Sequence, residues 1–341
     1  MGVSQSQPRD VKSVHFPAFE KNLPSLAGKT IVVTGCTTGT GYVLARTAIR
    51  KGAENVLLLN RPSARADAAE ESLKKEVTTV EGTAATNVET IPCDLQSFEN
   101  VRKAAGAIKA KYEGVDVLCN NAGVMALEDC TTEDGYDVQM QTNHLSHFLL
   151  MHELLPLLKA AKERRGEARV VSHSSAARHG GKLEAKYFGK NGGNLGGNKA
   201  GWVPFSGPKW ERYHQTKLAN SVFTLALKER LDKSQDYEGI IAAAAAPGLA
   251  ATNLQITTAE TGGMQGSMWI MRFAQSAEDG TMPLAAACFD PATENGSFWE
   301  PNGKTRLAGE ARMFELEPKI HDEESMAMLW EQSEEACGTM F

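Results

Sequence analysis

Short apolar runs alternate with longer helix-like stretches along most of this chain. Runs of strand length lie at 29–34, 55–59, 87–92, 115–119, 168–172 and 239–246, and helical patterns lie at 42–51, 64–76, 98–112, 139–163 and 210–231. A further helix from 277, an edge strand at 296–299 and a charged helix at 322–335 follow. Such alternation favours right-handed crossovers on a parallel sheet. We therefore predict an α/β fold with a doubly wound, mostly parallel seven-stranded sheet and helices on both faces.

Two segments interrupt this pattern. Residues 1–27 are polar and proline-punctuated, which predicts a flexible tail that lacks the apolar core of a secretion signal. The tail begins Met1-Gly2-Val3-Ser4-Gln5-Ser6, a match to the N-myristoylation pattern, although a plain tail would need no lipid. One lipid chain would give weak, peripheral membrane contact. The Gly/Asn-rich run at 191–201 predicts a surface loop inside an insertion at about 183–209.

Composition excludes several classes of protein. The net charge is −6, which argues against a nucleic-acid partner, and no apolar run approaches the ~18 residues that span a bilayer. The six cysteines form no CxxC pair. Scattered cysteines in a chain of 341 residues favour free thiols in a reducing compartment such as the cytoplasm.

Three glycines follow the first predicted strand. Thr34 to Gly41 reads TGCTTGTG, with Gly35, Gly39 and Gly41 ahead of a helix. Glycine lets a pyrophosphate approach the backbone where free N–H groups of the helix favour an anion. An ordinary strand-to-helix turn is the alternative for a glycine trio taken alone. Cys36 within the loop is interpreted as a small filler rather than a redox thiol.

The end of the second strand bears on the choice of dinucleotide. A carboxylate there would bind the ribose 2′-OH and select NAD. This chain has Asn60-Arg61 instead, with Arg65 nearby. A guanidinium binds a phosphate bidentately, so the sequence predicts NADP(H). The alternative is that Arg61 is only a solvated surface charge.

A tyrosine and a lysine four residues apart carry the candidate chemistry. Tyr213 and Lys217 share one face of the predicted helix at 210–231, where an ammonium is expected to lower the pKa of the tyrosine. Tyr213 would then act as general acid and base. Ser175 follows the fifth strand and can hold a carbonyl oxygen, and Asn143 could anchor a water linked to Lys217. Taken alone, the Tyr/Lys spacing is also typical of a helix-surface pair.

Taken together, these segments resemble the short-chain dehydrogenase/reductase family. The matching text is TGCTTGTG at 34–41, CDL at 93–95, NNAG at 120–123, Asn143, SS at 174–175, YHQTK at 213–217, PG at 247–248 and Thr252. The runs LLLNRP, QTNHLSHFLL, YHQTKLAN and LWEQSEEACG are most similar to the retinol-dehydrogenase-like branch, which includes WW-domain oxidoreductases and light-dependent protochlorophyllide reductases. The resemblance implies one Rossmann domain over 28–338.

The resemblance also assigns roles. It implies that Tyr213 transfers a proton, Ser175 polarises the substrate oxygen, Lys217 tunes Tyr213 and binds the nicotinamide ribose, and Asn143 supports a proton relay. Asp94 would meet the adenine, Asn121 would lie beside the cofactor, and Thr252 would contact the carboxamide. The full implied cofactor set is Gly35, Thr37, Thr38, Gly39, Thr40, Gly41, Arg61, Asp94, Leu95, Asn121, Ala122, Gly123, Tyr213, Lys217, Pro247, Gly248 and Thr252.

Three departures from the family concern the substrate. Ser175 and Tyr213 are 38 residues apart, more than usual, because of the insertion. Ala246 precedes Pro247 where relatives often carry His, and His173 stands where relatives usually have a small or apolar residue.

A methionine-rich segment lies where the family places a substrate lid, at about 253–276, and suits a lipophilic substrate or a packed helix face. His144, His147 and His152 are interpreted as ordinary histidines, and no metal site is predicted.

The sequence thus predicts an NADP(H)-dependent oxidoreductase that acts on a carbonyl or alcohol of a lipophilic substrate: a retinoid, steroid, fatty or isoprenoid compound. Two alternatives remain open. One is a non-catalytic NADP-binding scaffold or partner subunit, and the other is a double-bond reductase of the protochlorophyllide type. The oligomeric state, monomer or homodimer, is open as well.

Overall fold

The structure is a computed structural model. It describes residues 11–79, 86–199, 201, 203, 205–252, 254, 258, 268–317, 320 and 322–341. The predicted myristoylation pattern at Gly2 lies outside these residues. So do most of the predicted lid at 253–276 and positions 200, 202 and 204 of the insertion.

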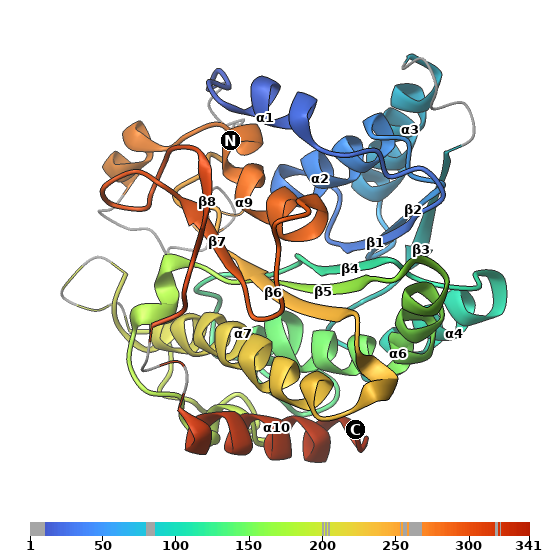
Figure 1. Cartoon of the computed structure of the whole chain (residues 1–341). Coiled ribbons are helices and arrows are strands. Elements are labelled where there is room, and N and C mark those ends of the chain that lie inside the picture. The colour runs from blue at the N-terminus through green and yellow to red at the C-terminus, as the bar shows by residue number, and fades with distance from the viewer. Residues whose placement is uncertain are drawn as a thin grey trace.

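A single twisted sheet forms the centre of the molecule (Figure 1). Within the described residues it has eight strands in the order β3-β2-β1-β4-β5-β6-β7-β8. Seven are parallel: β1 Thr30–Thr34, β2 Asn55–Asn60, β3 Asn87–Pro92, β4 Val117–Asn120, β5 Ala168–His173, β6 Ile240–Ala245 and β7 Phe298–Pro301. All five residues of β1 are buried. The other central strands are also rich in apolar residues, so the sheet needs helices over both of its faces.

The predicted strand count was one too low. An eighth strand, β8 Ala311–Phe314, pairs antiparallel with β7 at the edge of the sheet. Only four residues long and partly exposed, β8 lacks the continuous apolar run that marks the buried strands.

Helices cover both faces of the sheet, as Figure 1 shows. On one face lie α1 Phe16–Asn22, α2 Gly39–Arg50, α3 Ala64–Thr79 and α9 Ala277–Phe289. On the other lie α4 Phe98–Lys111, α6 Ser146–Arg165, α7 Pro208–Asp232 and, outermost, α10 Glu323–Cys337. The prediction of a doubly wound sheet is confirmed. None of the helices in the described residues is both long enough and apolar enough to cross a membrane.

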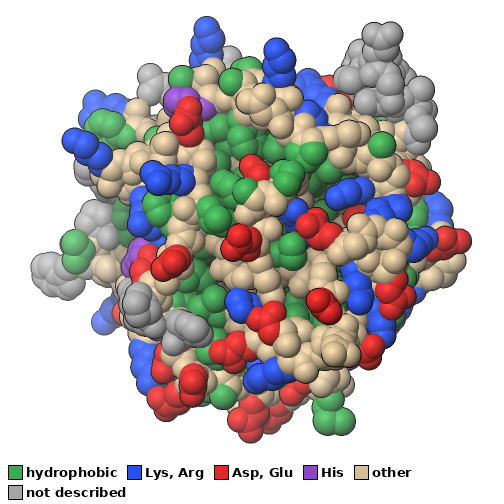
Figure 2. Space-filling view, in the orientation of Figure 1, with side chains coloured by type: hydrophobic (Ala, Val, Ile, Leu, Met, Phe, Trp, Pro, Cys, Tyr) green, Lys and Arg blue, Asp and Glu red, His purple; other side chains and the backbone are tan. Residues whose placement is uncertain are grey.

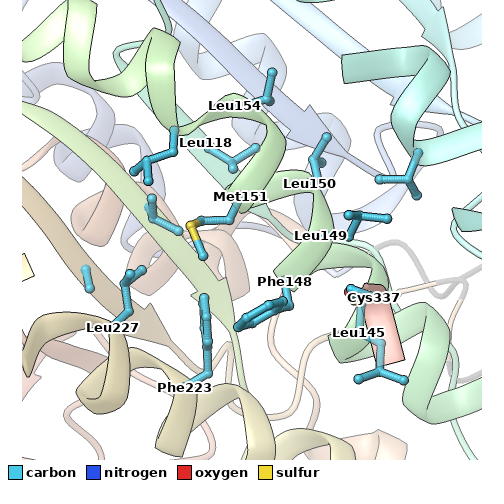
Figure 3. Packing of buried hydrophobic residues seen from close by; sticks show 14 of the residues in the cluster. Leu118, Leu145, Phe148, Leu149, Leu150, Met151, Leu154, Phe223, Leu227 and Cys337 are labelled. Atoms are coloured by element: carbon cyan, nitrogen blue, oxygen red, sulfur yellow. The ribbon is translucent and has the colours of Figure 1, made fainter. Parts of the chain in front are cut away.

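An aromatic cluster lies within the apolar core between α6, α7 and α10. Phe148 of α6 and Phe223 of α7 meet edge to face, with ring centroids 5.8 Å apart, as Figure 3 shows in part. Trp330 of α10 closes this cluster at 5.0 Å from Phe148. The acidic side of α10 faces solvent, where Figure 2 shows carboxylates gathered along the lower edge. The predicted charged helix therefore has one buried apolar side and one solvated side.

Part of the predicted flexible tail is structured. Phe16, at the start of α1, is 2% exposed and packs against Val43 and Met282. The Asp279 carboxylate accepts hydrogen bonds from three successive backbone N–H groups, at residues 14–16, each at 2.9 Å. A partner more than 260 positions away leaves no local signal in the sequence, so composition alone did not predict α1.

The helix predicted at 139–163 is interrupted near its start. Val138–Met140 (α5) leads into one π-helical turn, Gln141–Leu145 (η1), before α6 begins. π-turns of this kind are frequent at functional sites. Asn143 lies inside this turn.

Candidate active site

The predicted site residues gather where parallel strands end. In register, Asn120 at the end of β4 lies beside Ser172 of β5, and His173 of β5 lies beside Ala245 of β6. The glycine loop follows β1 on the same edge. In open α/β sheets, ligands bind outside the carboxyl ends of the strands.

The glycine loop is shaped so that only small residues fit. Gly35 and Gly39 have φ of 71° and 63°, in the left-handed region. A Cβ on Gly41 would lie within 3 Å of both the Gly35 carbonyl and the Asn121 side chain. Thr38 caps α2 without a side-chain hydrogen bond, so the first N–H groups of this 12-residue helix are not satisfied from there. This cradle fits a pyrophosphate.

Asn121 ties the loop to β4. Its Nδ2 donates to the carbonyls of Thr34, at 2.8 Å, and Gly35, at 3.1 Å. Its Oδ1 accepts from the Thr40 hydroxyl at 2.9 Å. The Thr34 hydroxyl oxygen accepts in turn from the backbone N–H groups of Asn121 and Ala122, at 3.0 and 2.9 Å. The NNAG segment therefore lies directly under the loop, and the Asn121 amide is committed to holding it.

The end of β2 offers two groups to a ligand. Asn60 accepts from the Cys36 N–H at 2.7 Å, but its buried Nδ2 has no partner among the described residues. Arg61 is exposed and forms no ion pair within the described part of the chain. Cys36 is fully buried, donates to the Val33 carbonyl, and has its thiol pKa raised by burial. It behaves as the predicted filler rather than as a reactive thiol.

The next strand end carries the predicted adenine contacts. Asp94 follows β3 and accepts from the Gln96 N–H at 3.0 Å, which shapes the turn into α4. Leu95 is buried, and its carbonyl accepts from the Ser146 hydroxyl at 2.6 Å. Both residues thus lie on the edge that carries Asn60 and the glycine loop.

Tyr213 lies on α7 and is 4% exposed. Burial raises its pKa to about 12, against a smaller opposing effect of its hydrogen bond with Ser175. Lys217, one turn further, has its ammonium 5.8 Å from the centre of the tyrosine ring. In this structure burial is the largest influence on the phenol, and the lowering of its pKa by Lys217 stays a prediction.

Lys217 is itself buried, which lowers its pKa to about 7. Its Nζ donates to the backbone carbonyl of His173 at 2.8 Å. Gly123 keeps space open beside it, since a Cβ there would lie 3.5 Å from Nζ and 3.2 Å from the Asn143 Oδ1.

Asn143 is used more fully than expected. Its Nδ2 donates to the Val124 carbonyl and to the Thr216 hydroxyl, both at 2.9 Å, and its Oδ1 accepts from the Val124 N–H at 2.8 Å. The amide thus fastens the segment after β4 to α7, next to Lys217. The water-linked relay through Asn143 stays a prediction.

The segment after β6 returns to the glycine loop. Gly248 has φ of 67°, and a Cβ there would collide with the Leu307 carbonyl. The Pro247 carbonyl accepts from the Gln275 amide at 2.8 Å. Thr252 lies so close that a Cβ on Gly39 would be 3.3 Å from its side chain. The structure thus brings the predicted Thr252 contact to the same edge as the loop.

Comparisons with known proteins agree with this geometry. The family model described as short chain dehydrogenase matches residues 29–188. A short chain dehydrogenase/reductase of Colletotrichum higginsianum is 31% identical, over 90% of this chain and 74% of the relative. Human retinol dehydrogenase 13 is 30% identical, over 92% of this chain and 86% of its own.

The chain belongs to the short-chain dehydrogenase family. The retinol dehydrogenases among its relatives place it in that branch, so it is an oxidoreductase of the class that acts on alcohol or carbonyl groups. Among solved structures, an uncharacterised protein from Mycobacterium paratuberculosis superimposes with a TM-score of 0.68 at 31% identity, covering 94% of this chain and 98% of the other. L-sorbose reductase from Gluconobacter frateurii shares the fold, with a TM-score of 0.57 at 21% identity over 80% of this chain and 95% of the other.

A buried arginine, Arg178, holds the loop that carries Ser175, and it was not predicted from the sequence. Arg178 binds the Glu300 carboxylate of β7 bidentately at 2.8 and 2.9 Å, and also pairs with Glu317. Its Nη1 donates to the Ser175 carbonyl at 3.2 Å. Its guanidinium stacks 4.4 Å from the Phe298 ring. No local pattern marks a residue whose partners lie more than 100 positions away.

A second buried arginine anchors the insertion. Arg212 of α7 is fully buried between Asp129 and Asp137, at 3.7 and 3.3 Å. It also donates to backbone carbonyls of the insertion, at Leu195 and Gly197. The carboxylate of Asp129 accepts from the N–H groups of the same two insertion residues, both at 2.8 Å. The Gly/Asn-rich run, predicted as a surface loop, is therefore held through its backbone by the buried side chains of Asp129 and Arg212.

The insertion brings an aromatic ring to the dehydrogenase centre. Phe205 stands edge to face on Trp210, with ring centroids 4.9 Å apart, and Trp210 stands likewise on Tyr213, at 5.8 Å. Met125, Ala126, Ala177, Leu254 and Met271 complete this apolar cluster. Several separate segments of the chain thus pack apolar side chains around the Tyr213 ring.

Each of the three histidines near the start of the long helix has a hydrogen-bond partner, although His152 Nδ1 has none among the described residues. The hydroxyl of Thr34 already accepts two N–H groups, so its own hydrogen points to His147 Nε2 at 2.9 Å. His147 Nδ1 then donates to the Asn143 carbonyl at 3.1 Å. His144 Nε2 is 3.0 Å from the Ser333 hydroxyl, and His152 Nε2 bonds the Met340 carbonyl. No cluster of three metal-ligating side chains occurs among the described residues.

Proposed function

We propose that this protein is an NADP(H)-dependent oxidoreductase that transfers a hydride between nicotinamide and the carbonyl or alcohol of a lipophilic substrate. The observation that carries the proposal is the position of Tyr213. The buried phenol is hydrogen-bonded to Ser175, lies one helical turn from Lys217, and occupies the same sheet edge as the glycine cradle.

The cradle supports a dinucleotide, and the end of β2 supports the phosphorylated form. Asn60 Nδ2 and the Arg61 guanidinium, which have no partner within the described part of the chain, lie where an adenine ribose is expected, and the end of β2 carries no Asp or Glu that would repel a 2′-phosphate. L-sorbose reductase, a structural neighbour, was solved with NADPH, and another neighbour was solved with NADH. Because these neighbours differ in cofactor, Arg61 is the basis for proposing NADP(H).

The bound cofactor would supply or accept the hydride, and the chain's own groups handle the proton. A pKa of about 12 keeps Tyr213 protonated at neutral pH, so its hydroxyl has a proton to donate to a carbonyl oxygen. Ser175 would polarise the same oxygen. Lys217 in its charged form would stabilise the phenolate that remains. These states favour carbonyl reduction as the physiological direction.

The aromatic cluster supports a lipophilic substrate. Phe205, Leu254 and Met271 are only partly buried and pack against the cluster that contains Tyr213. Apolar pockets with few polar groups are typical of sites for such ligands. Relatives named retinol dehydrogenase belong to the same branch.

Separate titrations with NADPH and NADH test the cofactor assignment. The unaltered chain should bind NADPH more tightly than NADH, and Arg61→Ala should weaken NADPH about tenfold or more while leaving NADH unchanged. Arg312→Ala, an exposed arginine of β8, is the matched control and should change neither constant. Binding of neither nucleotide to the unaltered protein would refute the proposal, and equal affinities unaffected at Arg61 would remove the phosphate specificity.

A further inference from the structure

His173 occupies the last position of β5, between two parts of the proposed cofactor site. Its backbone carbonyl accepts from Lys217 Nζ at 2.8 Å and from Asn220 Nδ2 at 3.0 Å. Its ring Nδ1 lies 2.9 Å from Asn121 Oδ1. The residue therefore touches both the lysine beside the catalytic phenol and the amide beneath the glycine loop.

The hydrogen bonds fix which ring nitrogen carries the proton. Asn121 Nδ2 donates to two backbone carbonyls, so the remaining amide atom facing His173 is oxygen and can only accept. His173 Nδ1 must then be the donor. In the neutral ring Nε2 is left as a bare acceptor, and it has no hydrogen-bond partner among the described residues.

The ring stays neutral at physiological pH. Burial, together with the positive charge of Lys217, lowers the pKa of His173 to about 3. His173 is nevertheless only partly buried as a residue, unlike the other residues of β5. A neutral lone pair cannot bind a phosphate anion, but it can accept from a hydroxyl or an amide N–H.

We propose that His173 Nε2 is a cofactor-binding group that accepts a hydrogen bond from an O–H or N–H donor in the nicotinamide half of the dinucleotide. This inference rests on the proposed function. A dinucleotide that extends from the glycine loop toward Tyr213 has to pass the span between Asn121 and Lys217, which His173 bridges. The pyrophosphate is served by the cradle, so the donors that suit Nε2 are those of the nicotinamide ribose and carboxamide.

Two substitutions separate the ring nitrogens. His173→Asn keeps a donor near the place of Nδ1, and so the contact to Asn121, but it lacks an acceptor at the place of Nε2. His173→Gln extends further and offers an amide oxygen near the place of Nε2. Calorimetric titration would compare NADPH with 2′,5′-ADP, a probe that carries the adenine half and its 2′-phosphate but no nicotinamide half.

The expected result is a selective loss. His173→Asn should weaken NADPH about three- to tenfold and leave 2′,5′-ADP unchanged, and His173→Gln should restore part of the NADPH affinity. Unchanged NADPH binding in His173→Asn would overturn the inference while the proposed function stands. Equal weakening of both ligands would also overturn it, because His173 would then only support the loop through Asn121. If the unaltered protein bound neither ligand, the proposed function would fail first and this inference with it.

Discussion

The loop after β1 and the loop after β5 lie on the same sheet edge, but different forces hold them. The glycine loop is fixed by uncharged groups: the Asn121 amide and the Thr34 hydroxyl reach it through hydrogen bonds of 2.8 to 3.1 Å. The Ser175 loop and the insertion are held by fully buried arginines, Arg178 and Arg212, each paired with two carboxylates.

This difference affects how two parts of the proposed site tolerate substitutions. The nucleotide half contains the glycine loop, and the substrate half contains the Ser175 loop and the insertion. A neutral network exchanges one hydrogen bond for another at modest cost. A buried charge that loses its partner pays the full loss of hydration, so each arginine makes its region depend on particular carboxylates. The half proposed to bind nucleotide therefore depends on small residues in fixed places, and the half proposed to bind substrate depends on buried ion pairs.

The largest expected effect lies where the two halves meet. Tyr213→Phe removes the proposed proton donor but keeps the ring that stands against Trp210. Turnover with any carbonyl substrate should fall about 10²- to 10⁴-fold, because general acid catalysis of that size is lost. NADPH affinity and thermal stability should remain as they were. A variant with intact turnover would mean that neither half serves a reaction at this tyrosine.

The dependence of the substrate half on buried charge is tested by Arg212→Leu. Asp129 and Asp137 would lose their buried counter-ion, which should lower the free energy of unfolding by about 3–5 kcal/mol. The Michaelis constant for bulky substrates should rise because the insertion loses its anchor, while NADPH binding changes little. Denaturant unfolding and substrate kinetics measure the two effects.

A matched control is available at the surface. The exposed pair of Lys182 and Glu324 is solvent-screened, so Lys182→Leu should leave stability unchanged. If Arg212→Leu and Lys182→Leu changed stability equally, the buried arginine would not be a special anchor of the substrate half.

Gly41→Ala probes the nucleotide half in the same way. The added Cβ would press on the Gly35 carbonyl and on Asn121, and overpacking of this kind costs about 1–3 kcal/mol. The loss should appear mainly as weaker NADPH binding, since the loop would have to open. Gly106→Ala, at an exposed position of helix α4 with open space around it, should instead stabilise the fold slightly. Equal behaviour of the two glycine variants would show that the cradle is not tightly packed.

The two halves also differ in how well the sequence predicts them. The parallel strands, the glycine cradle and the gathering of Ser175, Tyr213 and Lys217 follow from apolar periodicity and motif spacing, because those signals are local. The anchors Arg178 and Arg212 are not predictable in this way, since an arginine in a loop or helix is usually exposed. Strand β8 was missed because its four residues carry too short a pattern. The burial that raises the pKa of Tyr213 is not predictable from a local pattern, because burial depends on the whole fold.

The smallest expected effect concerns pH and separates the two neighbouring groups of the centre. Burial lowers the pKa of Lys217 to about 7, so its side chain is mostly charged below that pH and mostly neutral above it. Tyr213, with a pKa of about 12, stays protonated over the whole of this range. If the charged lysine stabilises the phenolate formed on proton donation, the rate of carbonyl reduction should fall as pH rises through 7, by at most about tenfold per pH unit. Lys217→Arg keeps its charge throughout and should move the decline out of the measurable range. A reduction rate that stays flat from pH 6 to 9 in the unaltered protein would show that the lysine charge does not assist the phenol. Its main contribution would then be the hydrogen bond that holds the end of β5 through His173.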